Sequence, residues 1–431
     1  MNSLANLRAG KLRGAREVRL SEGLEEFPRE LLELSDTLEV LDLSGNRLHS
    51  LPTDFGRLKA LRIAFFSDNI FTCLPRELAQ CPELSMVGFK ANRIEEFPED
   101  ALPPGVRWLI LTDNRLQQLP TSIARLEHLQ KLMLAGNRLE SLPEGMSGLH
   151  RLELLRLSAN QLPELPAWIG ELPRLSWLAY AGNPFCRHRS RPADAVAISW
   201  SELELGPCLG SGASGDIFQA LWIPKNLQVA VKVFKGEVTS DGYPQDESQA
   251  CLQAGRHPGL VEVLGATATQ EGRQALVLAL IPPEFRNLGG PPSRASCTRD
   301  TYPDGTVFHQ EFALRVARDV ASACAHLHGR GLLHGDLYAH NVLTDSQGRS
   351  LFGDFGAASP LDVLPPVLAK RMVRLESRAF GCLLDDLGSR IAPEDNAFKT
   401  SLLGLRDACW SPDPDTRPDL GTICQELSIL P

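Results

Sequence analysis

A repeat of 22 or 23 residues runs through the first 185 residues of the chain and constrains its fold more than any other feature. Segments such as LEVLDLSGNRLHSLP and LQKLMLAGNRLESLP follow one pattern, and LSWLAYAGNPF ends the series. A fixed period of this length, kept over many turns, predicts a solenoid of stacked coils. The asparagines that mark the period are Asn46, Asn69, Asn92, Asn114, Asn137, Asn160 and Asn183.

Each coil carries apolar residues eight, five and three positions before its asparagine, as in Leu38, Leu41 and Leu43 before Asn46. We expect these side chains to point inward, the residues between them to form a strand, and the asparagine to bond backbone groups at the next turn. The pattern resembles that of leucine-rich repeat proteins, which implies a curved parallel sheet with return segments on its convex side. Gly23, one period before Asn46, indicates a degenerate first coil that caps the array.

Residues six and four positions before each asparagine are expected on the concave face, where many are apolar. A large exposed apolar patch usually marks an interaction site, so this stripe predicts contact with a protein partner or with the second half of the chain. It is also possible for neighbouring coils to cover these side chains, or for the strand face to lie one residue away from this assignment. The partner-binding candidates are Ile63, Phe65, Met86, Trp108, Ile110, Met133, Leu154 and Trp177.

The stretch HGDLYAHNVLTDSQGRSLFGDFG, residues 334–356, gathers acidic and amide side chains within one short hairpin. Asp336 can accept or orient the proton of an attacking hydroxyl, while Asn341 and Asp354 offer hard oxygen ligands suited to magnesium. NVL and SLFGD indicate two short strands around a polar turn, so both ligand ends can face one cleft. Phosphoryl transfer from a metal-bound nucleotide uses such a set, because the protein mostly positions the nucleophile and the cation.

A glycine-rich segment lies upstream, with Gly210, Gly212 and Gly215 between two apolar strand-like runs. Glycine lets the backbone approach phosphate oxygens closely. The two-strand setting argues against a dinucleotide-binding fold, in which a helix follows the glycines.

Lys232, in the strand-like run VAVK, is the expected phosphate-contacting lysine. The segment PQDESQACLQAGRHPG, predicted to be helical, offers Glu247 as its ion-pair partner, with the neighbouring Asp246 as an alternative.

The order and spacing of these motifs resemble those of the protein kinase family over residues 198–431. QALVLALIPPEF resembles the strand that leads to the kinase hinge, RLESRAFGCLLDDL resembles the buried central helix, and CWSPDPDTRPDL matches a CWxxxPxxRP signature. The polar segment RNLGGPPSRASCTRDTYPDGT indicates an insert after the hinge strand.

The resemblance implies ATP-dependent phosphoryl transfer with Mg²⁺, or Mn²⁺, as the cation. It implies Lys232, Glu247 and Asp336 as catalytic residues and Asn341 and Asp354 as metal ligands. The implied nucleotide-binding residues are Gly210, Ser211, Gly212, Gly215, Ile217, Ala230, Lys232, Leu278, Ala279, Leu280 and Ile281. The implied structural or regulatory residues are His334, Phe355, Gly356, Glu376 and Arg417.

Three departures from the family pattern bear on regulation. Gly335 replaces the arginine that reads a phosphate on the activation segment, and Tyr338 replaces the lysine that serine/threonine kinases place near the moving phosphoryl group. His340 can substitute for that lysine in part. The segment after Gly356 is short, has no APE motif and has Ser359 as its sole hydroxyl before Glu376, which predicts a kinase not switched by loop phosphorylation.

The net charge of −9 disfavours nucleic acid or an anionic membrane as the main partner. The sequence has no apolar run of membrane-spanning length, and its first residues lack the apolar core of a signal peptide. Ten scattered cysteines without a CxxC pair indicate a reducing compartment, so we expect a cytoplasmic location.

Together these features predict an α/β multidomain protein: a leucine-rich repeat domain at 1–185, a linker at 186–197 and a bilobal protein kinase fold at 198–431. The arrangement resembles bacterial repeat-containing kinases. The favoured function is that of a protein kinase, with serine/threonine specificity, whose repeats recruit a partner or regulate the enzyme. Two alternatives stay open, a phosphotransferase for small molecules and a nucleotide-binding scaffold.

Overall fold

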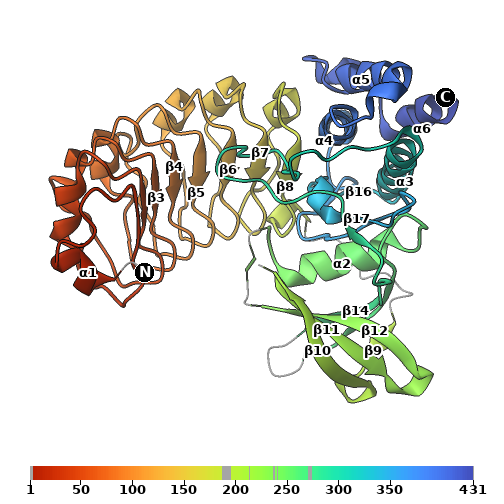
Figure 1. Ribbon diagram of the computed structural model, residues 1–431, viewed down its shortest axis with the longest axis horizontal. Helices are drawn as coiled ribbons and strands as arrows, with labels where there is room; N and C mark the ends of the chain where they lie inside the picture. The colour runs from red at the N-terminus through yellow and green to blue at the C-terminus, as the bar shows by residue number, and fades with distance from the viewer. Residues whose placement is uncertain are drawn as a thin grey trace. The chain divides into compact units, whose positions relative to one another are not determined.

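The computed structural model describes residues 3–186, 196–212, 214–235, 238–239, 241–269 and 274–430 (Figure 1). It divides into two compact units, Met1–Leu172 and Pro173–Pro431. Most of the predicted linker, residues 187–195, lies outside the described residues.

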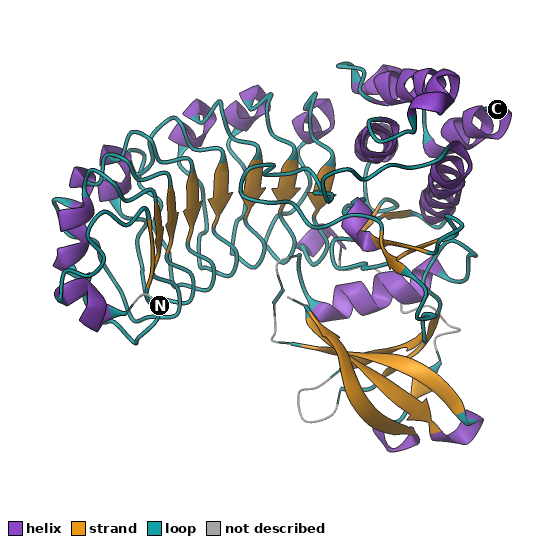
Figure 2. Cartoon of the chain, viewed as in Figure 1, coloured by secondary structure: helices purple, strands orange, loops and turns teal. Residues whose placement is uncertain are grey.

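The repeats of the first unit form a parallel sheet whose strands follow chain order (Figure 2). Equivalent positions of successive coils pair with each other, for example Trp108 with Lys131, so the predicted repeat is confirmed. The strands are β1 (Glu17–Arg19), β2 (Val40–Asp42), β3 (Ile63–Phe65), β4 (Met86–Gly88), β5 (Trp108–Ile110), β6 (Lys131–Met133) and β7 (Leu154–Arg156).

Short 3₁₀ helices form the return segments on the convex side, as expected. The helix α1 (Leu4–Arg8) precedes β1, and the pairing of β1 with β2 confirms the degenerate first coil. The 3₁₀ helices are η1 (Arg29–Leu34), η2 (Phe55–Arg57), η3 (Arg76–Gln80), η4 (Thr121–Arg125), η5 (Glu144–Gly148) and η6 (Ala167–Glu171).

The repeat asparagines connect neighbouring coils. The Asn137 side chain is buried, its Oδ1 accepts from the Leu116 backbone N–H at 3.1 Å, and its Nδ2 donates to the Leu111 carbonyl at 2.8 Å. The same Nδ2 donates to the Leu134 carbonyl of its own coil at 3.0 Å. Buried backbone groups need such partners, which explains why one residue type recurs at this position.

The predicted alternation of burial is present in β2, β5 and β6. In β5 the central Leu109 is fully buried, while Trp108 and Ile110 on either side are half-buried. Other members of the stripe are buried, and the partly open Phe65 ring lies beside Gly88 of the next coil. The stripe is therefore narrower than the sequence indicates. Its buried members are Ile63, Met86, Leu154 and Trp177, and its partly open members are Phe65, Trp108, Ile110 and Met133.

The second unit begins with the strand of the last repeat, β8 (Trp177–Ala179), followed by η7 (Pro184–Cys186). A six-stranded sheet and one helix then form a small lobe (Figure 1). The sheet has the order β10-β11-β12-β14-β13-β9, and Val229, Val231 and Val277 lie in its apolar core. Its elements are β9 (Ala197–Ile198), η8 (Trp200–Glu202), β10 (Leu203–Ser211), β11 (Gly215–Trp222), η9 (Ile223–Lys225), β12 (Leu227–Phe234), α2 (Pro244–Ala254), β13 (Val263–Thr267) and β14 (Ala275–Ala279).

A larger, mainly helical lobe follows, so the predicted bilobal fold is confirmed. The expected hairpin after the catalytic stretch is present as the antiparallel pair β17 and β18. The elements are β15 (Arg286–Asn287), α3 (Gln310–Gly329), β16 (Leu332–Leu333), η10 (Ala339–Asn341), β17 (Val342–Thr344), β18 (Ser350–Phe352), β19 (Ser359–Pro360), α4 (Pro366–Gly388), η11 (Pro393–Asp395), α5 (Asn396–Cys409), η12 (Pro414–Thr416) and α6 (Leu420–Ile429).

Candidate active site

A buried ion pair links the sheet of the small lobe to its helix. Lys232 lies inside β12, and its Nζ is 2.5 Å from Oε1 of Glu247 on α2 and 3.4 Å from Oδ1 of Asp354. Burial opposes the ammonium charge, but the carboxylates of Asp354 and Glu247 outweigh it and raise the pKa of Lys232. Lys232 is therefore a fixed cation in the lining of the site.

The side chains of Asp336 and Asn341 bond each other across the catalytic stretch. The Asn341 Nδ2 donates to the Asp336 carboxylate at 2.8 Å and to the Asp336 carbonyl at 3.0 Å. These bonds use the nitrogen of the Asn341 amide and leave its oxygen as the atom suited to a hard cation. They also fix the orientation of the Asp336 carboxylate.

His334 is a structural residue at the base of this loop. Its ring is fully buried and stacks on Phe352 with centroids 3.9 Å apart. Nε2 lies 3.1 Å from the Gly353 carbonyl and Nδ1 accepts from the Asp336 N–H at 3.3 Å, which assigns the ring proton to Nε2. Burial lowers the pKa of His334, consistent with a neutral ring.

Glu376, on the central helix α4, accepts a hydrogen bond from the backbone of the same loop. Its Oε1 accepts from the Gly335 N–H at 2.7 Å, and its Oε2 is 2.6 Å from His328 Nε2. Burial opposes the charge of Glu376, yet the bond to His328 and its charge keep the pKa of Glu376 below its ordinary value. A buried carboxylate with two such partners fixes the backbone just before Asp336.

The Asp354-Phe355-Gly356 turn follows β18. Asp354 has a φ of 60°, a left-handed conformation that aspartate tolerates better than most residues. Burial disfavours the carboxylate charge, but the charge of Lys232 and its hydrogen bond hold the pKa of Asp354 below its ordinary value. The carboxylate is therefore ionised at neutral pH and half-exposed to the cleft, while the buried Phe355 ring packs 5.1 Å from that of His334.

Lys232, Glu247, Asn341 and Asp354 line one cavity of about 320 Å³, whereas Asp336, His334 and Glu376 are not among its lining residues. Its size and its apolar lining, with a few polar groups at one end, suit a small-molecule ligand. Cys251 and Val263 add apolar walls. The predicted site residues in its lining are Ile217, Lys232, Glu247, Leu278, Ile281, Asn341, Asp354 and Phe355.

The other predicted nucleotide-binding residues do not line this cavity. Ala279 and Leu280 border a larger space of about 550 Å³ beside Arg256, whose lining includes neither Lys232 nor Asp354. We take the smaller cavity as the candidate site because Lys232, Glu247 and Asp354 line it. Ala230 is buried on β12, where it pairs with Leu278.

The glycines lie where β10 turns into β11, and no helix follows them, as predicted. Gly210 pairs with Ile217 and Ser211 with Asp216, while the Gly212 N–H donates to the Gly215 carbonyl at 2.9 Å. A side chain at Gly215 would lie 2.5 Å from the Val233 carbonyl, so only glycine fits there.

Asp300 contacts a residue of the cavity lining, although no sequence motif signals it, and it lies in the insert after the hinge strand. Asp300 is buried, its Oδ1 is 2.6 Å from His340 Nδ1, and its Oδ2 accepts from the Ala339 N–H at 2.5 Å. Burial opposes a charged ring, but the bond to Asp300 and its charge raise the pKa of His340. His340 also lines the cavity, so the insert shapes the site.

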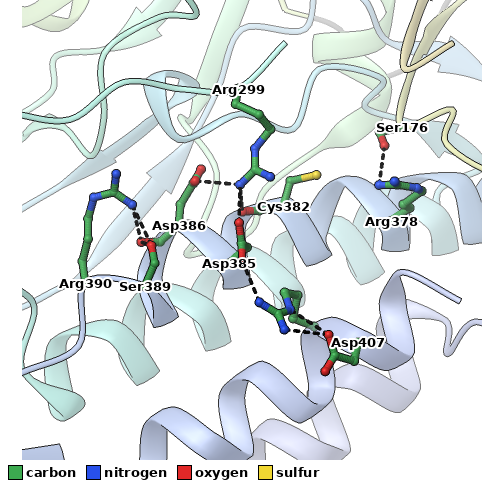
Figure 3. A network of polar contacts seen from close by, with 10 residues as sticks. Ser176, Arg299, Arg378, Cys382, Asp385, Asp386, Ser389, Arg390 and Asp407 are labelled. Atoms are coloured by element: carbon green, nitrogen blue, oxygen red, sulfur yellow. Dashed lines mark hydrogen bonds and ion pairs between the residues drawn. The ribbon is translucent and has the colours of Figure 1, made fainter. Parts of the chain in front are cut away.

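The insert is itself held against α4. Arg299, next to Asp300, donates to the carboxylates of Asp385 at 3.0 Å and Asp386 at 2.7 Å, and to the Cys382 carbonyl (Figure 3). No short-range motif signals these contacts, because Arg299 and its partners on α4 are more than 80 residues apart.

Comparison with known proteins finds matches in both halves of the chain. A model of the protein tyrosine and serine/threonine kinase domain matches residues 203–364, and leucine-rich repeat models match 37–58, 104–162 and 129–185. The chain carries leucine-rich repeats and a protein kinase domain.

Similar proteins include a serine/threonine-protein kinase/receptor of Acanthamoeba polyphaga mimivirus, by its name, which is 24% identical over 57% of this chain and 17% of its own length. A LIM domain-containing serine/threonine-protein kinase of Dictyostelium discoideum, also by its name, is 24% identical over 54% of this chain and 40% of its own. The epidermal growth factor receptor of Apis mellifera is 28% identical over 38% and 12%. The chain thus spans less than half the length of these relatives.

Two further features, a membrane-spanning helix and a cluster of metal ligands, were sought in the residues that the structure describes. Among them, no helix combines the length and apolar character that a membrane crossing requires. They also include no cluster of three or more histidine, cysteine or acidic side chains arranged for a metal ion.

Proposed function

We propose that this protein is an ATP-dependent protein kinase that transfers the γ-phosphoryl group of ATP to a protein hydroxyl. One observation carries the proposal: Lys232, Glu247, Asn341 and Asp354 come from separate elements to line one cavity, and the Asn341 side chain bonds the Asp336 carboxylate. The names of the relatives favour serine or threonine as the acceptor.

The donor set of the cavity fits ATP with a divalent cation. Asn341 and Asp354 offer oxygen ligands, and the apolar walls of Leu278 and Ile281 suit an adenine ring. Bound Mg²⁺, or Mn²⁺, would neutralise charge on the phosphate oxygens. Lys232 would orient the phosphates, because Glu247 fixes its ammonium from the other side.

Asp336 would act as the base for the acceptor hydroxyl. The hydroxyl oxygen forms a bond to the γ-phosphorus, its proton passes to the Asp336 carboxylate, and the bond from phosphorus to the bridging oxygen breaks as ADP leaves. The Asn341 amide holds the carboxylate in place for this role. Most of the catalytic effect would come from such positioning and from fixed charges.

The decisive experiment incubates the purified chain with labelled ATP and Mg²⁺, alone and with cell lysate. Asp336→Asn and Lys232→Met serve as controls, since each removes one proposed role while nearly preserving shape. We expect label on proteins, at serine or threonine, and its loss in both controls. Label confined to small metabolites would favour a small-molecule phosphotransferase, and nucleotide binding without transfer would favour a scaffold.

For the repeats we propose a protein-binding role on the partly open concave residues Phe65, Trp108, Ile110 and Met133. A lysine lies over one of these rings, with Lys131 Nζ 4.3 Å from the Trp108 centroid, so the surface is apolar with a cationic edge. Trp108→Glu combined with Met133→Glu should abolish partner capture. Unchanged capture and unchanged phosphotransfer would contradict this role.

We keep the repeat domain at 1–185, the linker at 186–197 and the kinase domain at 198–431 as the proposed division by sequence. We also propose a cytoplasmic location, because all ten cysteines are free thiols, as expected in a reducing compartment.

A further inference from the structure

The last repeat coil, residues 173–183, belongs to the array by sequence but lies in the second unit with the catalytic stretch. The indole of Trp177 on β8 stacks on the ring of Tyr338, with centroids 4.3 Å apart and planes 7° apart. Its Nε1 donates to the Leu337 carbonyl at 2.9 Å. Trp177 and Tyr338 are 1% and 5% exposed, so this contact, next to Asp336, excludes water.

The backbone of the last coil comes equally close to the catalytic stretch. Gly335 has a φ of 73°, and a Cβ at this position would collide with the Leu178 carbonyl oxygen and lie 2.8 Å from that of Ala357. Glycine is therefore required where protein kinases usually carry an arginine. The close approach of the Leu178 carbonyl therefore explains why this position departs from the family pattern. The same departure removes the arginine that would read a phosphate on the segment after Gly356.

Tyr180 of the same coil holds the segment that follows Gly356. Its backbone N–H donates to the Ser359 hydroxyl at 2.9 Å, and its phenol donates to the Pro360 carbonyl at 2.7 Å. Ser359 in turn pairs with Leu333 in the two-stranded sheet of β16 and β19, directly before His334. The coil thus contacts both chain segments that border the active site.

Two arginines of the large lobe fix the start of the coil. Arg378 on α4 donates to the Pro173 carbonyl at 3.1 Å and to the Ser176 hydroxyl at 3.4 Å, the latter drawn in Figure 3. Arg417, predicted to be a structural residue, is 1% exposed and donates to the same Pro173 carbonyl at 2.7 Å and to the Ser411 carbonyl at 2.9 Å. The coil is anchored to the kinase lobe through charged donors, which form stronger hydrogen bonds than neutral ones.

The catalytic groups are in contact with one another while the coil is in this position. The Lys232–Glu247 pair and the Asp336–Asn341 bond are both present. The position of the coil is therefore compatible with the catalytic arrangement. We propose that Trp177 is a positioning residue for phosphoryl transfer. It holds the Leu337 carbonyl and the Tyr338 ring on one side of Asp336. The bonds to Glu376 and His334 hold the backbone at and before Asp336.

This role rests on the proposed kinase activity, and it makes a specific demand on the kinetics. Trp177 is not part of the cavity lining, so its loss should leave nucleotide affinity unchanged. Without the indole N–H, the buried Leu337 carbonyl loses its donor, and the loop gains alternative conformations. The turnover number should fall while the KM for ATP stays constant, because positioning acts in the transition state.

The test compares Trp177→Phe with Trp168→Phe in the full chain. Trp168 is a buried tryptophan of the preceding coil whose Nε1 has no hydrogen-bond partner among the described residues, so the same substitution removes no such bond. One readout is amide hydrogen exchange of residues 334–341, and the other is Mg·ATP hydrolysis with water as the acceptor. Tyr338→Leu removes the same ring stack by changing the partner of Trp177. It shows whether the effect comes from the contact itself or from a disturbance of the coil around Trp177.

We expect exchange of 334–341 to rise about tenfold in Trp177→Phe and turnover to fall about tenfold, with the KM for ATP within about twofold of the original. Trp168→Phe should match the unaltered chain, and Tyr338→Leu should resemble Trp177→Phe. Equal exchange in both tryptophan variants, or faster exchange with unchanged turnover, would overturn the proposal. If the unaltered chain hydrolyses no ATP and labels no protein, the kinase function fails, while the exchange readout still decides whether Trp177 fixes the loop.

Discussion

Trp108 and Trp177 occupy the same position of the repeat, three coils apart, yet they have different environments. Trp108, in the first unit, is half-buried on the concave face beneath Lys131. Trp177, in the second unit, is 1% exposed and stacked on Tyr338. The comparison teaches that a repeat position fixes the direction of a side chain but not its function, which depends on what the fold places against it.

The largest difference is expected from truncating the two tryptophans. Trp177→Ala should destabilise the chain by about 3–5 kcal/mol, because it empties a buried, hydrogen-bonded site, whereas Trp108→Ala should cost about 1 kcal/mol. Denaturant unfolding followed by circular dichroism measures both. Equal losses would mean that the two positions do not differ energetically.

The second prediction concerns the close backbone approach at Gly335. Gly335→Ala should cost about 2–4 kcal/mol, since it combines a left-handed backbone with a collision against Leu178 and Ala357. Gly148→Ala, in a coil of the first unit where a Cβ meets nothing within 4 Å, should change stability by no more than about 1 kcal/mol. A tolerated alanine at Gly335 would show that the coil does not press on the loop.

The third prediction concerns pH. Asp246 on α2 lies beside Gly182 of the last coil, and its buried Oδ2 has no hydrogen-bond partner among the described residues. Burial raises the pKa of Asp246 to about 6. The folded chain therefore binds a proton on the Asp246 carboxyl more tightly than the unfolded chain does. The stability that this proton contributes is fully present below the ordinary aspartate pKa, and it is lost as the pH rises through 6.

Asp246→Asn should remove that pH dependence and stabilise the chain at pH 7.5 by about 1–3 kcal/mol. Urea unfolding at several pH values between 4 and 7.5 measures it. The exposed Asp304→Asn is the matched control, with a pH profile expected to follow that of the unaltered chain. Identical profiles for Asp246→Asn and the unaltered chain would contradict the prediction.

The smallest effect is expected at Ser359. Its hydroxyl accepts from Tyr180 and donates to the Ala357 carbonyl, so Ser359→Ala should cost about 1 kcal/mol of stability. Phosphotransfer should change less than about twofold, because Gly335 leaves no arginine there to read a phosphate and Ser359 is fully buried. A large loss of activity without a loss of stability would point to a regulatory phosphorylation.

Periodicity and motif order are enough to predict much of this architecture. The repeat period identifies the inward and outward residues of each strand, as Leu109 and Trp108 show. Motif order indicates the small lobe, the hairpin of β17 and β18, and the long helices. Lys232 lies beside Glu247, and Asp336 beside Asn341, although their catalytic roles remain proposals.

Contacts between distant, non-periodic residues could not be predicted. Asp300 and His340 are 40 residues apart, and Trp177 and Leu337 are 160 apart, with no repeat or spacing rule that relates them. Such pairs depend on tertiary packing, which a local pattern does not encode. Trp177 carries one signal, its apolar character at an outward position, but Trp108 shares that signal.

The bond from Arg417 to the Pro173 carbonyl joins residues 244 positions apart and bears on how such chains could be rearranged in evolution. A gene fusion that exchanged repeat arrays at the connector, residues 186–197, would separate Arg417 from this acceptor and the catalytic stretch from Trp177. The compact unit that contains the kinase lobe starts inside the array, at Pro173. Recombinants that keep the last coil with the kinase lobe should inherit an intact module, whereas those joined at the connector should not.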